Sequence, residues 1–173
     1  MQPTSTTPST ARVALKAGLI TGLVMTVYSL ILNMAGLPQS SPLHYLTLLM
    51  LIGGLVYGMR EFKSQNGGFM SYGQGLGVGT LTAGVAGLLS SLVSTFYVKF
   101  VDPTVLQRTM DEQRIKMEER GMSDAQIEQA VKLAESMSSF SFLIATLSII
   151  LMGFVFSLVI AAIVKRDRDV FDA

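Results

Sequence analysis

The residues that could do chemistry in this sequence are few, and their spacing does not suit catalysis. His44 is the only histidine and cysteine is absent, so a metal site with several histidine or thiolate ligands is excluded. The neighbouring carboxylates Asp111 and Glu112, and again Glu118 and Glu119, alternate with basic residues along one predicted helix. This pattern is typical of a solvated helix face and matches neither a calcium loop nor an acid–base pair. We therefore expect no enzymatic activity, no bound metal and no cofactor.

One further segment and one group of polar residues are candidates for binding. The segment Gly73–Gly79 (GQGLGVG) looks superficially like a nucleotide-binding loop. It lacks the G-x-G-x-x-G spacing, no strand precedes it, and no Lys-Ser/Thr pair follows to hold a phosphate. A group of uncharged polar residues could instead line a polar path through a membrane: Asn33, Ser90, Ser91, Ser94 and Thr95. Such side chains ordinarily bond to the backbone or to a neighbouring helix, so packing is the alternative interpretation.

The elements that must position these residues are set by four long stretches without Asp, Glu, Lys or Arg: Ala17–Leu37, Leu43–Met59, Gln74–Val98 and Ser136–Val164. Charged residues make up 14% of the chain, against roughly 25% in soluble domains, and the mean hydropathy is +0.50. Four buried core helices would leave 173 residues too little polar surface to cover them. The sequence therefore predicts an all-α polytopic membrane protein with four transmembrane helices. With a net charge of +1 and no basic, aromatic-rich cluster, we expect no nucleic-acid partner.

The length fits one transmembrane bundle domain, residues 12–166, with a disordered Thr/Ser/Pro-rich tail at 1–11 and a C-terminal tail at 167–173. About 20 helical residues cross a 30 Å hydrocarbon core. The expected spans are residues 14–37, 43–59, 74–98 and 138–164. Because the second span is at the lower limit of length, a re-entrant hairpin is the alternative there.

Basic residues near the ends of the predicted spans indicate the orientation. They gather on one side of a four-span arrangement: Arg12, Lys16, Arg60, Lys63, Lys165, Arg166 and Arg168. On the other side, Pro38–Pro42 carries no charge, and most basic residues of Lys99–Glu135 lie far from a membrane boundary. We therefore expect both termini and the loop Arg60–Tyr72 in the cytoplasm, with the protein in the inner (plasma) membrane. The first span has no A-x-A cleavage site and is expected to be an uncleaved signal anchor.

Between the third and fourth spans, residues 102–137 predict two short amphipathic helices. Asp102-Pro103 is a helix start, Gly121 ends the first helix, and Ser123–Gln126 is a capping-box pattern that opens the second. The segment is acidic and has no aromatic residue, unlike helices that lie on a lipid surface. We expect an extramembrane helical hairpin that either docks a partner or is only a solvated connector. The candidate partner contacts are Asp111, Glu112, Glu118, Glu119 and Glu128.

Small residues recur at helical spacing in the third span: Gly75, Gly79, Ala83, Gly87 and Ser91. Residues four apart lie on one helix face, and small side chains let two helices approach closely. Gly18 and Gly22 in the first span, and Gly54 and Gly58 in the second, offer surfaces of the same kind. These residues form either a homodimer face or, in the alternative that we favour, the packing interface within the monomer's own bundle.

Taken together, these segments resemble the domain of unknown function 4199 family of small bacterial membrane proteins. The resemblance extends from Lys16 to Arg166 and is carried by four segments: Gly67–Gly79 (GGFMSYGQGLGVG), Val101–Val105 (VDPTV), Glu119–Ala130 (ERGMSDAQIEQA) and Phe156–Arg166 (FSLVIAAIVKR). It implies a four-helix inner-membrane protein of Gram-negative bacteria with a helical insert before the last span. It implies no known reaction and supplies no catalytic residues.

The leading functional hypothesis is a structural or interaction protein that presents an acidic periplasmic helical hairpin. Its partners would be membrane lipid and either a second copy of the chain or another membrane or periplasmic protein. The alternative is a small oligomeric transporter or channel, in which Asn33, Ser90, Ser94 and Thr95 would line the path.

Overall fold

The structure, a computed structural model, describes residues 9–38 and 41–167. Its regular elements there are helices, apart from one isolated bridge between Met70 and Arg166. The four long helices are α1 (Thr10–Met34), α2 (Tyr45–Gln65), α3 (Tyr72–Phe96) and α6 (Ser141–Val164). Two shorter helices, α4 (Thr104–Glu119) and α5 (Asp124–Met137), lie between α3 and α6 in the chain. Single turns extend three elements: the 3-10 turns Pro42–His44 before α2 and Ser138–Phe140 before α6, and the π-helical turn Tyr97–Val101 after α3.

Each long helix, with its adjoining turn, is long and apolar enough to cross a membrane. The four candidate spans are Thr10–Met34, Pro42–Gln65, Tyr72–Val101 and Ser141–Val164, with 25, 24, 30 and 24 residues. About 20 residues are needed for a 30 Å hydrocarbon core, so the second span also meets the length, because its helix continues past Met59 to Gln65. The expectation of an all-α chain with four such helices is confirmed.

The helix boundaries differ by a few residues from those expected, and local capping explains the differences. α1 begins at Thr10, inside the predicted tail, because the Ser9 side chain accepts a hydrogen bond from the Arg12 amide. It ends at Met34, ahead of Gly36, whose φ of 68° lies in the left-handed region that favours glycine. The remainder of the predicted tails, residues 1–8 and 168–173, lies outside the described residues.

The third and fourth long helices shift in the same way. A complete capping box between Ser71 and Gln74 starts α3 at Tyr72, two residues before the predicted span. α6 begins at Ser141 rather than at residue 138, because a 3-10 turn precedes it. α4 begins at Thr104, after Pro103, and the Asp102 carboxylate accepts a hydrogen bond from the Thr104 amide.

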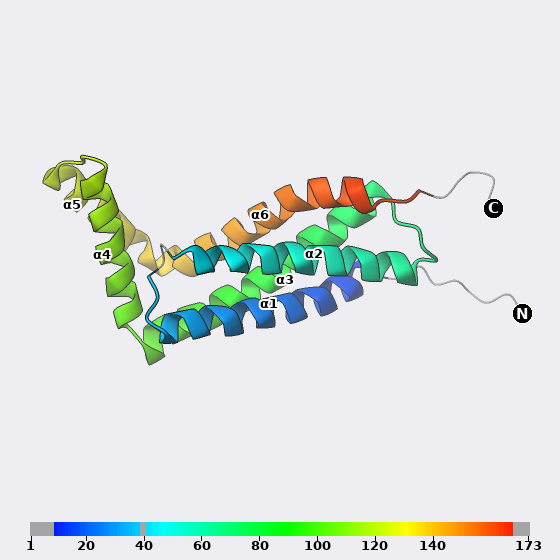
Figure 1. Cartoon of the computed structure of the whole chain (residues 1–173), viewed down its shortest axis with the longest axis horizontal. Helices are drawn as coiled ribbons and strands as arrows, with labels where there is room; N and C mark the ends of the chain where they lie inside the picture. Colours follow the sequence, from blue (N-terminus) through cyan, green and yellow to red (C-terminus); the bar gives the residue numbers. More distant parts are fainter. Residues whose placement is uncertain (1–8, 39–40, 168–173) are drawn as a thin grey trace, which may run out of the picture.

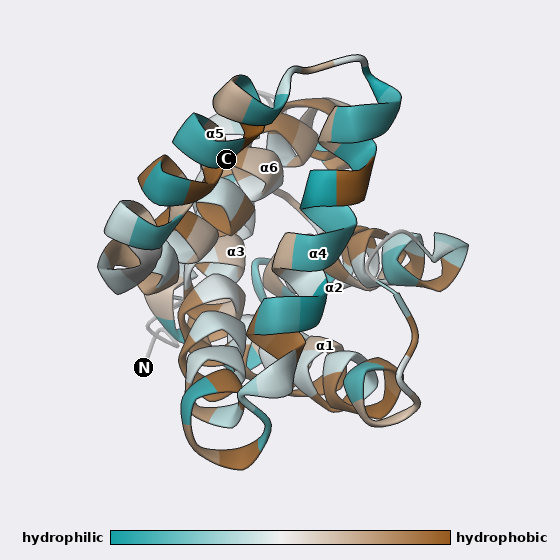
Figure 2. Ribbon diagram, turned by 90° about the vertical axis from the view of Figure 1, so that its left-hand side faces the viewer, coloured by the Kyte–Doolittle hydropathy of each residue, from teal (hydrophilic) through white to brown (hydrophobic). Residues whose placement is uncertain are grey.

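In the bundle, α3 contacts α1, α2 and α6, and α2 also contacts α1 and α6. Figure 1 shows the start of α1, the end of α6 and the α2–α3 connection at one end of the bundle. We call this the terminal end. The α1–α2 connection, α4 and α5 lie at the opposite end, which we call the α4–α5 end. Seen from that end, hydrophilic residues are prominent on α4 and α5 (Figure 2).

The tightest packing lies toward the terminal end. The largest fully buried side chains all belong to the second half of α2, the α2–α3 connection, the first half of α3 or the second half of α6: Leu55, Met59, Phe62, Met70, Val78, Thr82 and Ser157. Conversely, α2 buries no residue before Leu51. Large apolar side chains on the outer faces stay exposed, for example Leu23, Leu147 and Ile163, as expected of surfaces that meet lipid.

Backbone and side-chain contacts between distant segments stabilise the terminal end. Met70 and Arg166 exchange two backbone hydrogen bonds of 2.9 Å, which tie the α2–α3 connection to the residues after α6. The Lys63 ammonium donates to the Val164 carbonyl at 2.8 Å, where a cation also complements the carboxyl end of the α6 dipole. The Arg166 guanidinium lies over the Phe69 ring, 5.5 Å from its centroid. The terminal end of the bundle is therefore held together by segments that lie far apart in the sequence.

Candidate functional site

The small-residue stripe of α3 packs against α6 in an antiparallel interface. The facing pairs are Gly75–Ala161, Gly79–Ser157, Ala83–Gly153, Gly87–Ile149 and Ser91–Thr146. A Cβ atom added to Gly75 would lie 3.0 Å from the Ala161 Cβ atom, and one added to Gly87 would lie 3.1 Å from the Ile149 Cβ atom. Ser91 and Thr146 share a buried hydrogen bond of 2.6 Å between their hydroxyls. The two helices are therefore held close along several turns.

The other small residues face neighbouring helices of the same chain. Gly18 faces Thr82 and Val85, Gly22 faces Ala86, Gly54 faces Thr21, and Gly58 faces Ala17. For Gly22, an added Cβ atom would lie 3.0 Å from the Ala86 Cα atom, which is closer than ordinary packing allows. The predicted packing residues thus lie against the chain's own helices, and the stripe needs no second copy to cover it.

The predicted partner-contact residues lie on the two helices at the α4–α5 end. Asp111, Glu118, Glu119 and Glu128 are exposed, and Glu112 is half-buried. Glu128 forms an i,i+4 ion pair of 2.8 Å with Lys132. The structure therefore gathers these carboxylates on one projecting element, although it does not bring them into one compact cluster.

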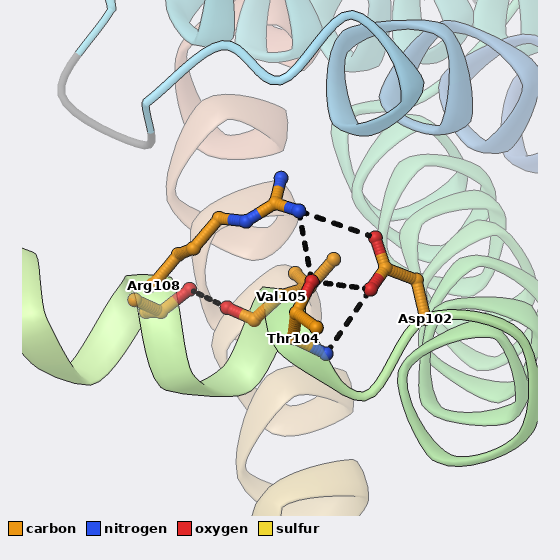
Figure 3. Close-up of polar contacts among 5 residues, drawn as sticks. Asp102, Thr104, Val105 and Arg108 are labelled. Carbon is orange, nitrogen blue, oxygen red and sulfur yellow. Dashed lines mark hydrogen bonds and ion pairs between the residues drawn. The ribbon is translucent and has the colours of Figure 1, made fainter.

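The start of α4 is fixed by a small polar network (Figure 3). The Asp102 carboxylate accepts hydrogen bonds from the Thr104 hydroxyl and, at 3.1 Å, from the Thr104 amide. The Arg108 guanidinium donates to the Thr104 hydroxyl at 2.8 Å and lies 3.9 Å from Asp102. The Thr104 hydroxyl bond is the largest influence that lowers the pKa of Asp102 below its ordinary value, and Arg108 adds to it. The network sets the direction in which α4 leaves the bundle.

Hydroxyl side chains from three helices line a cavity of about 190 Å³ in the half of the bundle toward the α4–α5 end. We call it the hydroxyl cavity. Its lining residues come from all four long helices: Met25, Thr26, Ser29 and Leu30 of α1, Thr47 of α2, Ser90, Ser91 and Ser94 of α3, and Ala145 and Ile149 of α6. Three members of the predicted polar group, Ser90, Ser91 and Ser94, are among them, whereas Asn33 and Thr95 are not.

Half of these hydroxyls already have partners. Thr26 donates to the Ser90 hydroxyl at 3.3 Å, and Ser90 donates to the Gly22 carbonyl at 3.2 Å, so the packing interpretation holds for this part of the group. By contrast, the hydroxyls of Ser29, Thr47 and Ser94 make no hydrogen bond within the described part of the chain. These last three come from three different helices.

The hydroxyl cavity is open at the exposed Ser94, so its contents exchange with the surroundings. Its volume of about 190 Å³ corresponds to about six water molecules. The unpartnered hydroxyls of Ser29, Thr47 and Ser94 favour water or a small polar molecule there, because such a molecule can exchange hydrogen bonds with them.

Asn33 lines a second cavity of about 270 Å³, between the end of α1 and α4. Its walls include Leu37 and Pro38 on one side and Val105 and Arg108 on the other. Because Asn33 lies one helical turn beyond Ser29 on α1, the two cavities follow one another toward the α4–α5 end.

No metal site accompanies these features. Within residues 9–38 and 41–167, no group of three or more His, Asp and Glu side chains is arranged to hold a metal ion. His44 lies in the turn before α2, remote in sequence from the acidic residues of α4.

Comparison with protein families matches the chain to a family described as a protein of unknown function (DUF4199), over residues 16–166. The chain belongs to the domain of unknown function 4199 family. The match runs through all four long helices and through α4 and α5, and it confirms the resemblance noted from the sequence. No curated protein and no solved structure matches the chain. Membership in the 4199 family therefore supports the architecture and assigns no activity.

Within this 4199-family chain, the sequence reasoning missed the hydroxyl residues outside α3. Thr26, Ser29 and Thr47 join Ser90 and Ser94 in the cavity wall. A signal was present in α1, because Thr26, Ser29 and Asn33 recur at intervals of three and four residues and so share one face of a helix.

Proposed function

We propose that this chain is a non-catalytic, multi-pass protein of the inner membrane that presents α4 and α5 to a partner protein in the periplasm. The orientation rests on basic residues near the helix ends: Arg12, Lys16, Arg60, Lys63, Lys165 and Arg166 all lie toward the terminal end. Positive charge near helix ends marks the cytoplasmic side. The terminal end would then be cytoplasmic, and α4 and α5 would form the periplasmic hairpin.

The observation that carries this proposal is the size of the segment between α3 and α6. Since these two helices lie side by side, antiparallel, a connection of 2–8 residues would join them. The α2–α3 connection uses only residues 66–71. Between α3 and α6 the chain instead places two helices of 16 and 14 residues. Of residues 102–137, only Val105 and Ile127 are buried. A segment that contributes so little burial to the bundle is better explained by an external role than by the stability of the fold.

The charge of this segment indicates the chemistry of the partner. Residues 102–137 carry eight acidic side chains against five basic ones, and the segment has no aromatic residue to anchor it in lipid. Asp111, Glu118 and Glu119 are exposed and form no ion pair among the described residues. A basic protein surface complements them, since opposite charges across an interface speed encounter and fix register.

Crosslinking in native membranes with a photoreactive residue at Gln113 tests the docking proposal. The expected result is a crosslink to a basic segment of one partner. This crosslink should be lost in the triple variant Asp111→Asn, Glu118→Gln, Glu119→Gln. The matched control is a triple variant of bases on the same segment, Arg114→Gln, Lys116→Gln, Arg120→Gln, in which the crosslink should persist or strengthen. Equal loss in both variants, or a yield unaffected by either, contradicts recognition by charge.

Reporter fusions at Asn66 and Gly121 test the orientation separately. Asn66 lies in the α2–α3 connection, and Gly121 lies between α4 and α5. A reporter active only in the cytoplasm should work at Asn66, and one active only in the periplasm should work at Gly121. The same compartment for both positions would refute the four-span arrangement.

The hydroxyl cavity favours a second candidate, the small oligomeric transporter or channel. Flux through one chain would need the path to continue past Leu55, Met59 and Val78, each fully buried in the terminal half. Deletion of residues 104–135 with a short linker separates the two candidates, because it removes the docking surface and leaves the hydroxyl cavity. Solute flux in proteoliposomes that survives this deletion would support the transporter. Loss of the partner in pull-down of the deletion variant, without any flux, supports docking.

A further inference from the structure

The hydroxyl cavity is lined by both hydroxyl and apolar side chains. The unpartnered hydroxyls of Ser29, Thr47 and Ser94 come from α1, α2 and α3, and each can both donate and accept a hydrogen bond. Leu30 and Ile149 supply apolar surface in the same cavity. Apolar walls with a few convergent polar groups are the usual make-up of small-molecule sites.

From this arrangement we infer that the hydroxyl cavity binds a small uncharged molecule with two or more hydroxyl or amide groups. The ligand would bridge Ser29, Thr47 and Ser94, and its carbon skeleton would lie against the apolar wall. The proposed binding site thus lies among the four long helices. It is separate from the docking surface on α4 and α5, and the inference does not depend on that proposal.

The lining excludes ions as the favoured ligand. Among the residues that the structure describes, no Asp, Glu, Lys, Arg or His side chain lines the hydroxyl cavity. An ion that entered would lose hydration without gaining a partner of opposite charge, which is strongly unfavourable. A neutral molecule with several hydrogen-bonding groups can exchange its bonds to water for bonds to the three hydroxyls.

The volume limits the size of the ligand. A cavity of about 190 Å³ is smaller than the roughly 300–1,000 Å³ of sites for drug-sized ligands. It holds about six water molecules, which corresponds to a short polyol or a small amide. A whole lipid is too large, although a single acyl chain could compete for the space.

The cavity is open at Ser94 and is bounded by tight packing toward the terminal end. Ser94 lines the cavity and is still exposed, so the cavity is open. In the terminal half, Met59, Val78 and Ser157 are fully buried, and the packed helices close the bundle there. A molecule can therefore reach the cavity without passing the buried residues of the terminal half.

The native chain has no cysteine, which makes single-cysteine labelling the direct test. Purified full-length protein in lipid nanodiscs is treated with a small, uncharged and water-soluble thiol reagent, 2-hydroxyethyl methanethiosulfonate. Ser94→Cys is the cavity variant, and Ser29→Cys repeats the measurement if the first variant does not fold. The matched control is Ser148→Cys, because Ser148 is an exposed serine on α6 beside the exposed, lipid-type residues Leu147 and Leu151. Ser157→Cys reports on the closed half.

The expected result is a labelling rate at least tenfold higher for Ser94→Cys than for Ser148→Cys and Ser157→Cys. Glycerol, the probe of ligand class, should slow the labelling of Ser94→Cys at least threefold. Sucrose at equal osmolality, which is too large for the cavity, should not slow it. Equal rates for Ser94→Cys and Ser148→Cys would overturn the inference. So would protection by sucrose as strong as that by glycerol, no protection by glycerol, or labelling of Ser94→Cys only by a lipid-soluble maleimide, which would identify an acyl chain as the occupant.

Discussion

Two adjacent glycines in α2 should respond to the same substitution in opposite directions. Gly53 and Gly54 are adjacent residues of the same helix, and replacement by alanine would add one methyl group to each. A Cβ atom at Gly53 would have no heavy atom within 4 Å in the described structure. At Gly54 it would collide with the side chain of Thr21 on α1, and even the Thr21 Cβ atom would be only 2.8 Å away.

The expected magnitudes follow from helix propensity and from packing. An alanine in place of glycine inside a helix gains about 0.5–1 kcal/mol, and Gly53→Ala should show that gain. Overpacking of a close interface costs about 1–3 kcal/mol. Thr21 is buried and its hydroxyl is bonded to the Ala17 carbonyl at 2.7 Å, so it cannot simply rotate away without losing that bond. Gly54→Ala should therefore be destabilising overall, by about 0.5–2 kcal/mol.

The assay is reversible unfolding of the purified protein in mixed micelles, followed by circular dichroism, with oligomer size measured in parallel. A second variant sharpens it, because Thr21→Ala removes two of the atoms that meet the added methyl group and should partly rescue Gly54→Ala. If Gly54→Ala were as stable as Gly53→Ala, the packing of α2 on α1 in this structure would be wrong. A change in oligomer size with unchanged monomer stability would instead support a homodimer face at Gly54.

Three further outcomes follow from particular contacts. Ser91→Ala removes the buried hydrogen bond to Thr146. It should therefore lower the free energy of unfolding by about 0.6 kcal/mol, the mean for hydrogen bonds between membrane helices. The same unfolding assay, in a double-mutant cycle with Thr146→Ala, checks this value. The pKa of Asp102 is lowered in the folded state. The ionised Asp102 carboxylate therefore stabilises the start of α4 fully above the ordinary aspartate pKa of about 3.9, and this stabilisation is lost as the pH falls below that value. Asp102→Asn should remove this acid-dependent loosening of α4, measured by hydrogen exchange between about pH 5 and about pH 2.5. Gly121 has a φ of 77° with open space around it, so Gly121→Ala should cost about 1–2 kcal/mol in the α4–α5 turn, seen as faster hydrogen exchange there and no change in α3.

The long helices could be predicted from the sequence because the bilayer leaves few alternatives. Four stretches without charge must satisfy all their backbone groups internally, and only a helix does so within one segment. The helix ends were less predictable, since they depend on single side chains. The bond from the Arg12 amide to Ser9, and the capping box between Ser71 and Gln74, each move a boundary by a few residues.

The pairing of the small-residue faces could not be read from the sequence. Gly75 and Gly79 define one small face of α3, but the spacing is the same whether that face meets another copy, α1 or α6. A different face of the same helix, which includes Ala86, receives Gly22 of α1. Only the three-dimensional arrangement assigns each face to its neighbour, and the hydroxyl cavity depends on that assignment because four helices contribute to it.

The packing at Gly54 and the hydroxyl cavity are connected by the path of α2. The buried residues of this helix begin at Leu51, so α2 packs most closely in its second half. Two transmembrane helices that crossed at the common angle of about 20° would separate by roughly 5 Å over ten residues, at 1.5 Å rise per residue. That separation is about the depth of one side chain. Such a crossing, with close approach at Gly54 and Gly58, would leave space near Thr47, where the hydroxyl cavity lies.

What occupies that space is determined by the residues that face it. Leucine or phenylalanine at these positions would fill the gap and give an ordinary apolar core. The chain instead places Ser29, Thr47 and Ser94 there, while Tyr28 bridges the ends of the gap by donating its hydroxyl to the Leu43 carbonyl at 2.9 Å. Small hydroxyl residues in this half of the bundle are costly if the space is dry and favourable if a polar molecule fills it. The residue choice in this half is therefore the strongest physical reason to look for a ligand inside the bundle as well as for a partner outside it.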